Sequence, residues 1–217
     1  MKTVRGPGNP VPFKLRKDAA ALIVVDMQND FVREGAPMEL SLCRAVIPNA
    51  KLIIDGCHER GIPVVYLKFI AGPKESLIWT WSPTLVPEVK CCWKNHRRSY
   101  QDVKGEAEVT DIVEELSPKP GDYIVEKYSY GGFYETNLHS ILLACHVSDL
   151  IVMGCATPFC VDDTVSEAFN RQYKVFLVSD ATGSFDEEFH RNSLRRIGMK
   201  YGRVLTTQEL LVEMKAP

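Results

Sequence analysis

The sequence lacks the features that membrane, secreted and nucleic-acid-binding proteins need. No apolar run approaches the roughly 18 residues of a membrane-spanning helix, and residues 1–7 lack the apolar stretch of a secretion signal. The formal net charge of -2 argues against general affinity for nucleic acid or for an anionic membrane surface. We therefore expect a soluble, cytoplasmic protein that has neither nucleic acid nor membrane among its partners.

Metal-binding and disulfide motifs are also scarce. The chain has seven cysteines, an odd number, and none of them forms the C-x-x-C pair of a zinc or redox site. The adjacent Cys91 and Cys92 are hard to bridge, because a disulfide needs more widely separated backbones than neighbouring residues have. We expect reduced thiols in a reducing compartment.

The composition is that of a chain with a full hydrophobic core. With 217 residues and 45% hydrophobic content, residues 19–217 are predicted to form a single domain. Residues 1–18 are rich in proline and glycine and predict an N-terminal arm that could reach a neighbouring subunit. Residues 70–105 show no clear periodicity and are predicted to form a lid or a subunit contact.

Apolar runs and helical patterns alternate along the chain. Strands are expected at residues 20–26, 63–69, 122–127, 149–154, 174–179 and 203–206. Helices are expected at residues 44–60, 109–116, 134–146, 160–171, 187–199 and from 208. This alternation predicts a three-layer α/β/α fold with a six-stranded, mainly parallel, doubly wound sheet. Ligands bind such sheets outside the carboxyl ends of the strands.

Cys160 stands where a strand turns into a helix. It follows the apolar run 149–154 and precedes apolar residues at helical spacing, among them Val161, Val165 and Ala168. Unpaired amide groups and the positive end of the helix dipole at such a position favour a thiolate. Most free cysteines are small core residues, so this run alone leaves both interpretations open.

Asp26 and Lys127 end two other predicted strands, so all three side chains are expected at one rim of the sheet. A carboxylate, an ammonium group and a thiol suit covalent hydrolysis, because Asp26 could take the proton of Cys160 while Lys127 keeps Asp26 ionised. Taken singly, Asp26 could cap a loop and Lys127 could be a surface charge. Their common position favours a site.

Four segments carry a resemblance to a known family. They are DMQNDF at 26–31, KYSYGGFYETNL at 127–138, the G-x-A-T-x-x-C-V-x-x-T pattern at 154–164 continuing to Ala168, and VSDAT at 178–182. Residues 20–211 resemble the isochorismatase-like cysteine hydrolases. The resemblance implies a catalytic triad of Asp26, Lys127 and Cys160. It also implies a non-proline cis peptide between Cys155 and Ala156, and an oxyanion hole made by the backbone N–H groups of Ala156 and Cys160.

The resemblance also narrows the reaction. Isochorismatases proper lack the nucleophilic cysteine, so Cys160 indicates hydrolysis of a C–N bond. Nicotinamidases carry histidine metal ligands after the second strand, whereas residues 68–73 read KFIAGP, so neither metal nor cofactor is expected. The remaining branch comprises amidohydrolases of biuret, triuret, ureidoacrylate and N-carbamoyl compounds, which release ammonia or an amine through a thioester. The alternatives are a nicotinamidase-like amidase, a redox thiol protein using Cys155 and Cys160, or a noncatalytic module.

The substrate is the least determined feature. The predicted pocket wall consists of Gln28, Phe31, Tyr130, Phe133 and Tyr134. Trp79, Trp81 and Trp93 could line the pocket or pin a loop, and the basic residues of segment 90–98 could attract a substrate carboxylate or face solvent. His190 is interpreted as a surface residue. The resemblance implies a homo-oligomer, either a tetramer or a dimer.

Overall fold

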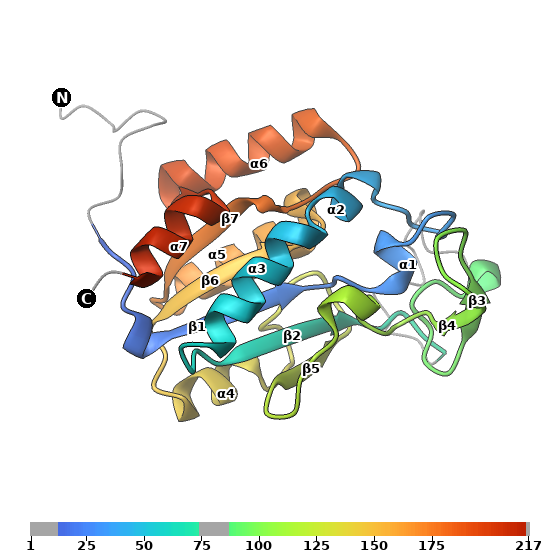
Figure 1. Cartoon of the computed structure of the whole chain (residues 1–217), viewed down its shortest axis with the longest axis horizontal. Helices are drawn as coiled ribbons and strands as arrows, with labels where there is room; N and C mark the ends of the chain where they lie inside the picture. Colours follow the sequence, from blue (N-terminus) through green and yellow to red (C-terminus); the bar gives the residue numbers. More distant parts are fainter. Residues whose placement is uncertain (1–12, 74–86, 216–217) are drawn as a thin grey trace.

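A six-stranded parallel sheet forms the centre of the protein (Figure 1). The computed structural model describes residues 13–73 and 87–215. The strands of the sheet are β1 (Ala20–Val25), β2 (Val64–Phe69), β5 (Tyr123–Lys127), β6 (Asp149–Gly154), β7 (Lys174–Thr182) and β8 (Gly202–Leu205). Their spatial order is β5-β2-β1-β6-β7-β8, and every neighbouring pair is parallel. The predicted parallel sheet is confirmed.

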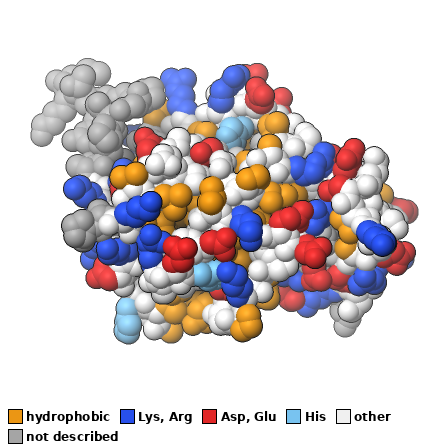
Figure 2. Space-filling model, viewed as in Figure 1, with side chains coloured by type: hydrophobic (Ala, Val, Ile, Leu, Met, Phe, Trp, Pro, Cys, Tyr) orange, Lys and Arg blue, Asp and Glu red, His pale blue; other side chains and the backbone are white. Residues whose placement is uncertain are grey.

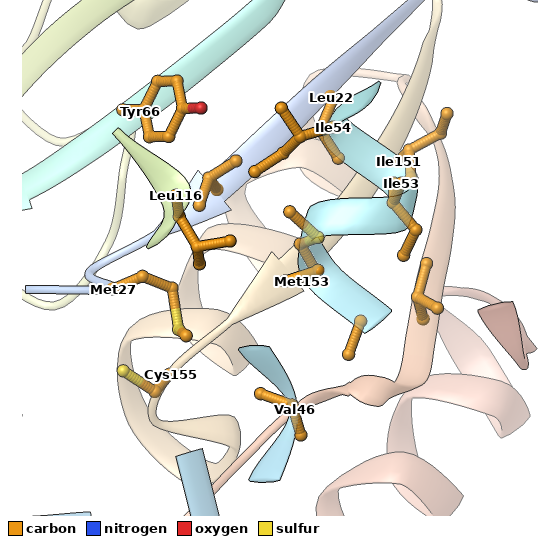
Figure 3. Packing of buried hydrophobic residues seen from close by; sticks show 14 of the residues in the cluster. Leu22, Met27, Val46, Ile53, Ile54, Tyr66, Leu116, Ile151, Met153 and Cys155 are labelled. Carbon is orange, nitrogen blue, oxygen red and sulfur yellow. The ribbon is translucent and has the colours of Figure 1, made fainter. Parts of the chain in front are cut away.

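Helices cover both faces of this sheet. They are α1 (Asn29–Val32), α2 (Ser41–Ala45), α3 (Ile47–His58), α4 (Leu138–Ala144), α5 (Asp162–Asn170), α6 (Glu187–Lys200) and α7 (Thr207–Lys215). Leu22 and Val24 of β1 share one core cluster with residues of α3 and α7, whereas Ile23 shares the other with residues of α4, α5 and α6. Figure 3 shows part of the first cluster, in which Ile54 of α3 lies beside Leu22 and Ile53 lies beside Ile151. Successive buried side chains of β1 therefore point to opposite faces of the sheet, and helices cover each face, which gives the predicted three layers.

Several element boundaries differ from the predictions. The helix predicted at 44–60 is divided at Val46 into α2 and α3, and Pro48 lies in the first turn of α3, where its missing N–H costs nothing. The prediction of a helix at 109–116 is wrong. Here Ile112 forms an antiparallel bridge with Gln28, and only the short 3-10 turn Glu114–Leu116 follows. Tertiary pairing overrides local propensity in this segment.

Two helices near the predicted site begin later in the chain than predicted. The helix predicted at 134–146 begins only at Leu138, because the Thr136 hydroxyl donates to Gly132 O and the preceding residues form a turn. The helix predicted from Cys160 is preceded by a π-helical turn, Thr157–Val161, which continues directly into α5. Cys160 therefore lies within the π turn.

The segment 70–105, predicted as a lid or subunit contact, contains the first strand of a small hairpin whose second strand follows directly after it. Strands β3 (Arg97–Ser99) and β4 (Glu106–Glu108) pair antiparallel, and a short 3-10 turn, Pro87–Val89, precedes them. Trp79 and Trp81 lie outside the described residues. Asp30 of α1 holds the segment, since its carboxylate accepts hydrogen bonds from Cys92 N at 2.8 Å and Tyr100 Oη at 2.7 Å. A lid or subunit contact stays a prediction.

The described part of the N-terminal arm packs against its own chain. The Phe13 ring meets Phe176 edge-on at 5.2 Å, and Arg16 N donates to Asp149 Oδ2 at 2.8 Å. A 3-10 turn, Lys17–Ala19, then leads into β1. Residues 1–12 of the predicted arm lie outside the described residues, and a contact of the arm 1–18 with a neighbouring subunit stays a prediction.

The surface agrees with the small net charge. Figure 2 shows basic and acidic side chains interspersed over the face viewed in Figure 1. Among residues 13–73 and 87–215, no helix has both the length and the apolar character needed to cross a membrane.

Candidate active site

Three strand ends bring the predicted catalytic side chains together. Asp26 directly follows β1, Lys127 ends β5, and Cys160 follows β6 after a tight turn. Because β5 lies beyond β2 in the sheet, Lys127 must cross the end of β2, where its register partner is Phe69. Its ammonium group lies 5.1 Å above the Phe69 ring, which supplies the favourable face of an aromatic quadrupole.

Asp26 and Lys127 form a buried ion pair. Lys127 Nζ lies 2.8 Å from Asp26 Oδ2, and the two side chains are 0% and 1% exposed. The same ammonium donates to Ser129 O at 3.0 Å. The Cys160 thiol lies close enough to both groups to shift their pKa values. The structure therefore brings all three predicted side chains together in a site closed to bulk water.

Burial and charge set the protonation of this group. Burial raises the pKa of Asp26, and the neighbouring Lys127 charge offsets part of that rise. Burial lowers the pKa of Lys127, but Asp26 and Cys160 outweigh it and bring the pKa to about 12. Burial raises the pKa of the Cys160 thiol, and the Lys127 charge opposes this only in part. This direction differs from the thiolate expected at a helix start, because desolvation and the facing Asp26 carboxylate outweigh the helix dipole.

The turn after β6 is pressed against the end of β1. Gly154 has φ +116°, and a Cβ at this position would lie 2.1 Å from Val25 O, so only glycine fits. The peptide bond between Cys155 and Ala156 is cis, which confirms the prediction. The Cys155 thiol donates to Asp26 O at 3.1 Å and so connects this turn with the loop of the carboxylate.

The predicted oxyanion donors lie in the same turn. Within the described part of the chain, the Ala156 N–H has no hydrogen-bond partner, while its carbonyl accepts from Phe159 N at 3.1 Å and Val161 N at 3.3 Å. These bonds hold the Ala156 peptide in the π turn that carries Cys160. Ala156 and Cys160 are 8% and 7% exposed, so a developing negative charge here would be shielded from water.

Two of the predicted substrate-binding residues are accessible. Tyr130 is 36% exposed and stacks on Phe159 with ring centroids 5.6 Å apart. Burial and the Cys160 charge raise the pKa of Tyr130. Tyr134 is 56% exposed. Tyr130 is the better placed of the two to touch a substrate bound at Cys160.

The other three predicted substrate-binding residues belong to the interior. Phe31 and Phe133 are 6% and 4% exposed and lie in separate core clusters. The Gln28 side chain is fully buried; its nitrogen donates to Phe69 O and Thr110 O, and its oxygen accepts from Phe69 N at 2.6 Å. Backbone hydrogen bonds thus engage the Gln28 amide, and Phe133 shares its core cluster with Cys160. A contact of Gln28, Phe31 or Phe133 with substrate stays a prediction.

Sequence reasoning missed several residues around the nucleophile. Phe159 is 43% exposed and continues a row of rings through Phe185 and Phe189. His190, interpreted as a surface residue, is half-buried, and its Nδ1 lies 2.8 Å from Thr157 Oγ1. The surface assignment of His190 is wrong. Helical periodicity could not show this contact, because it joins two elements that are distant in sequence.

One group of side chains has the composition of a metal site. The ligand atoms of Asp30, Cys91 and Cys92 all lie within 4.8 Å of one another and are buried. The Asp30 carboxylate is already engaged by the Cys92 amide and the Tyr100 hydroxyl, and Arg98 Nε forms an ion pair with it at 3.0 Å. The group is better explained as the anchor of residues 92–100 on α1.

The comparisons with known proteins agree with this geometry. A family model described as Isochorismatase domain matches residues 20–209. The chain is 30% identical over 226 residues to the ureidoacrylate amidohydrolase RutB of Agrobacterium fabrum, covering 97% of each protein. Among solved structures it resembles a cysteine hydrolase from Pseudomonas syringae pv. phaseolicola, with TM-score 0.82, 24% identity, and coverage of 95% of this chain and 97% of the other. It also resembles an N-carbamoylsarcosine amidase from Thermoplasma acidophilum, with TM-score 0.68, 26% identity, and coverage of 88% and 97%.

The fold defines a three-layer α/β protein whose structural neighbours are hydrolases. The chain belongs to the isochorismatase family. This membership confirms the resemblance, and the two named amide-cleaving relatives agree with the prediction of an enzyme that hydrolyses C–N bonds other than peptide bonds.

The protonation pattern predicts the pH profile of turnover. If Asp26 is the base that accepts the Cys160 proton, it must be ionised. Because its pKa is raised, kcat/KM is then expected to fall with decreasing pH through a limb above the usual range of about 4. No alkaline limb from Lys127 is expected below about pH 11, because its pKa is about 12. Steady-state kinetics between about pH 4 and about pH 10 measure this. A one-proton rise in kcat/KM between about pH 8 and about pH 9 would instead indicate an ordinary exposed thiol.

Proposed function

We propose that the protein is a cysteine-dependent amidohydrolase that cleaves a C–N bond of a small carbamoyl or ureido compound. The observation that carries the proposal is the buried Asp26–Lys127 ion pair, 2.8 Å between charged atoms, with the Cys160 thiol close enough to shift the pKa of both groups. A carboxylate paired with an ammonium group in a dry site beside a thiol is a base placed to activate a nucleophile.

The first half of the reaction forms a thioester. The Asp26 carboxylate takes the proton of the Cys160 thiol while the sulfur attacks the substrate carbonyl carbon. The N–H groups of Ala156 and Cys160 hold the oxygen that becomes negative, and Lys127 balances the charge passing between sulfur and carboxylate. The C–N bond then breaks, and Asp26 gives its proton to the nitrogen, which leaves as ammonia or an amine.

The second half restores the enzyme. Water attacks the thioester carbonyl carbon while Asp26 accepts a proton from the water, and the C–S bond then breaks. The proton returns from Asp26 to the sulfur, which the raised pKa of Cys160 favours. These steps need only the groups of the site and water.

The substrate class is supported by relatives as well as by geometry. The relatives named above are a ureidoacrylate amidohydrolase and an N-carbamoylsarcosine amidase, both of which are named for carbamoyl or ureido compounds. Tyr130 and Phe159 at the mouth of the site offer flat apolar surfaces to a planar ureido group. A homo-oligomer and a cytoplasmic location stay predictions.

Ammonia release tests the proposal directly. The purified protein is incubated with ureidoacrylate, biuret, triuret, N-carbamoyl amino acids and nicotinamide, with and without a chelator, and ammonia is counted against substrate consumed. We expect stoichiometric release from at least one carbamoyl or ureido compound and no effect of the chelator. Turnover of nicotinamide alone, or turnover lost with the chelator, would favour the nicotinamidase-like alternative. Absence of turnover across the panel would favour a noncatalytic or redox thiol protein.

A further inference from the structure

The turn that carries the nucleophile is held from a second side by the start of α6. Thr157 follows Ala156 and is fully buried. Its Oγ1 lies 2.8 Å from Gly183 O and 2.8 Å from His190 Nδ1. The hydroxyl thus joins the turn after β6 to a histidine in the first turns of a helix distant in sequence.

The hydrogen-bond roles follow from the groups available. Gly183 O can only accept, so the single Thr157 hydroxyl hydrogen is donated to it, and the threonine oxygen must accept from His190 Nδ1–H. Burial lowers the pKa of His190, so the ring is neutral at neutral pH with its hydrogen on Nδ1. The tautomer is thereby assigned from the hydrogen-bond network.

Gly183 provides a fixed reference for this contact. Thr157 N donates to Gly183 O at 2.9 Å, and Gly183 N donates to Gly154 O at 3.0 Å. A Cβ at Gly183 would lie 2.6 Å from Cys43 Sγ, so this backbone cannot move closer to α2. Thr157 therefore lies between a carbonyl that packs against α2 and the His190 ring.

The helix that carries His190 is itself well anchored. Asp186 caps α6, since its Oδ1 accepts from Glu188 N at 2.8 Å and Phe189 N at 2.9 Å. Phe185, just before the cap, stacks on Phe159 of the π turn with centroids 5.9 Å apart. The start of α6 thus contacts the nucleophile turn through both a ring stack and a hydrogen bond.

We infer that His190 is a positioning residue for hydrolysis: by holding Thr157, it fixes the direction in which the neighbouring Ala156 N–H points at the reacting carbonyl oxygen. His190 contacts Thr157 and not the reacting atoms, so it affects hydrolysis only through the position of the π turn Thr157–Val161. The inference rests on the proposed function. Since removing an oxyanion donor costs about 10²-fold or more in kcat, misdirecting one is expected to cost about tenfold.

A matched pair of variants isolates the hydrogen bond. His190→Leu replaces the ring with an apolar side chain that has no hydrogen-bond donor. His190→Asn instead places an amide nitrogen near the position of Nδ1. We expect His190→Leu to lower kcat about tenfold with KM within about twofold, and His190→Asn to recover most of kcat. The exposed neighbour Arg191 on the same helix serves as control, and Arg191→Leu is expected to behave as wild type.

Two further measurements separate positioning from a merely structural role. On a Thr157→Val background, His190→Leu is expected to have little additional effect on kcat, because the two residues act through one bond. Alkylation of Cys160 by iodoacetamide forms no oxyanion, so its rate is expected to be unchanged in His190→Leu. Independent effects of the two substitutions, or equal loss of kcat in the leucine and asparagine variants, would overturn the inference.

Nitrogen NMR of the histidine ring provides a readout that needs no substrate. The ring of His190 is expected to be neutral with its hydrogen on Nδ1, and the opposite tautomer would contradict the inference even if no compound were turned over. Normal wild-type turnover with an unaffected His190→Leu variant would overturn only this inference. Turnover that survives loss of the Cys160 thiol would overturn the proposed function instead.

Discussion

Cys160→Ala is expected to abolish turnover, by at least about 10⁴-fold, while leaving the fold intact. The sulfur is the atom that forms the thioester, and no hydroxyl or thiol is left in its place. Cys160 is 7% exposed and packs in a core cluster, so alanine leaves a small gap next to Val161 without leaving a buried charge unpaired. Steady-state ammonia release and thermal unfolding of the purified variant measure the two effects.

Cys145→Ala is the matched control for this experiment. Cys145 is a partly exposed free thiol whose Sγ lies 3.5 Å from Tyr123 Oη, well outside the triad. It should retain full activity and should not accumulate a substrate-derived adduct. Intact mass spectrometry after mixing with substrate should show the thioester only in proteins that keep Cys160. Wild-type rates in Cys160→Ala would dismiss the thioester scheme.

Lys127→Met is expected to damage both activity and stability. Removing the ammonium leaves the Asp26 carboxylate buried without its partner, and breaking such a pair costs about 3–5 kcal/mol of unfolding free energy. The pKa of Asp26 would rise further, so the carboxyl group would hold its proton and could not accept one from Cys160. We expect at least a ~10²-fold loss of kcat/KM, measured together with urea unfolding.

Two comparison variants separate the effect of the buried ion pair from the general effect of losing a lysine. In Lys94→Met, the lost partner is Glu126 in an ion pair whose side chains are 41% and 35% exposed, so the cost should stay below about 1 kcal/mol. The double variant Asp26→Asn with Lys127→Met removes both charges and should recover much of the stability but none of the turnover. If Lys127→Met were as stable and as active as Lys94→Met, the buried pair would have no catalytic role.

Much of the fold could be read from periodicity alone. All six predicted runs became strands of the parallel sheet. The four inner strands β2, β1, β6 and β7 are mostly buried, whereas the edge strands β5 and β8 are partly exposed. The failed helix at 109–116 shows where this reasoning stops. Ile112 is held by its bridge to Gln28, and no local pattern at 109–116 could reveal a partner more than 80 residues away.

The candidate site likewise has residues that the sequence could predict and contacts that it could not. The rule that parallel strands present their carboxyl ends at one edge was enough to bring Asp26, Lys127 and Cys160 to one rim. It could not show that Gln28 would be consumed by backbone hydrogen bonds or that His190 would reach Thr157. Those outcomes depend on how loops fold over the sheet, which strand periodicity does not encode.

The sequence by itself determined the order of strands and helices, because buried strands must be apolar. It also determined the residue types at the strand ends, because polar reactive residues stand where the apolar runs stop. Only the tertiary structure decided the protonation of those groups. The raised pKa values of Asp26 and Cys160 arise from exclusion of water and from a facing charge carried by another strand. Both are properties of an assembled interior, and no segment of the chain possesses them alone.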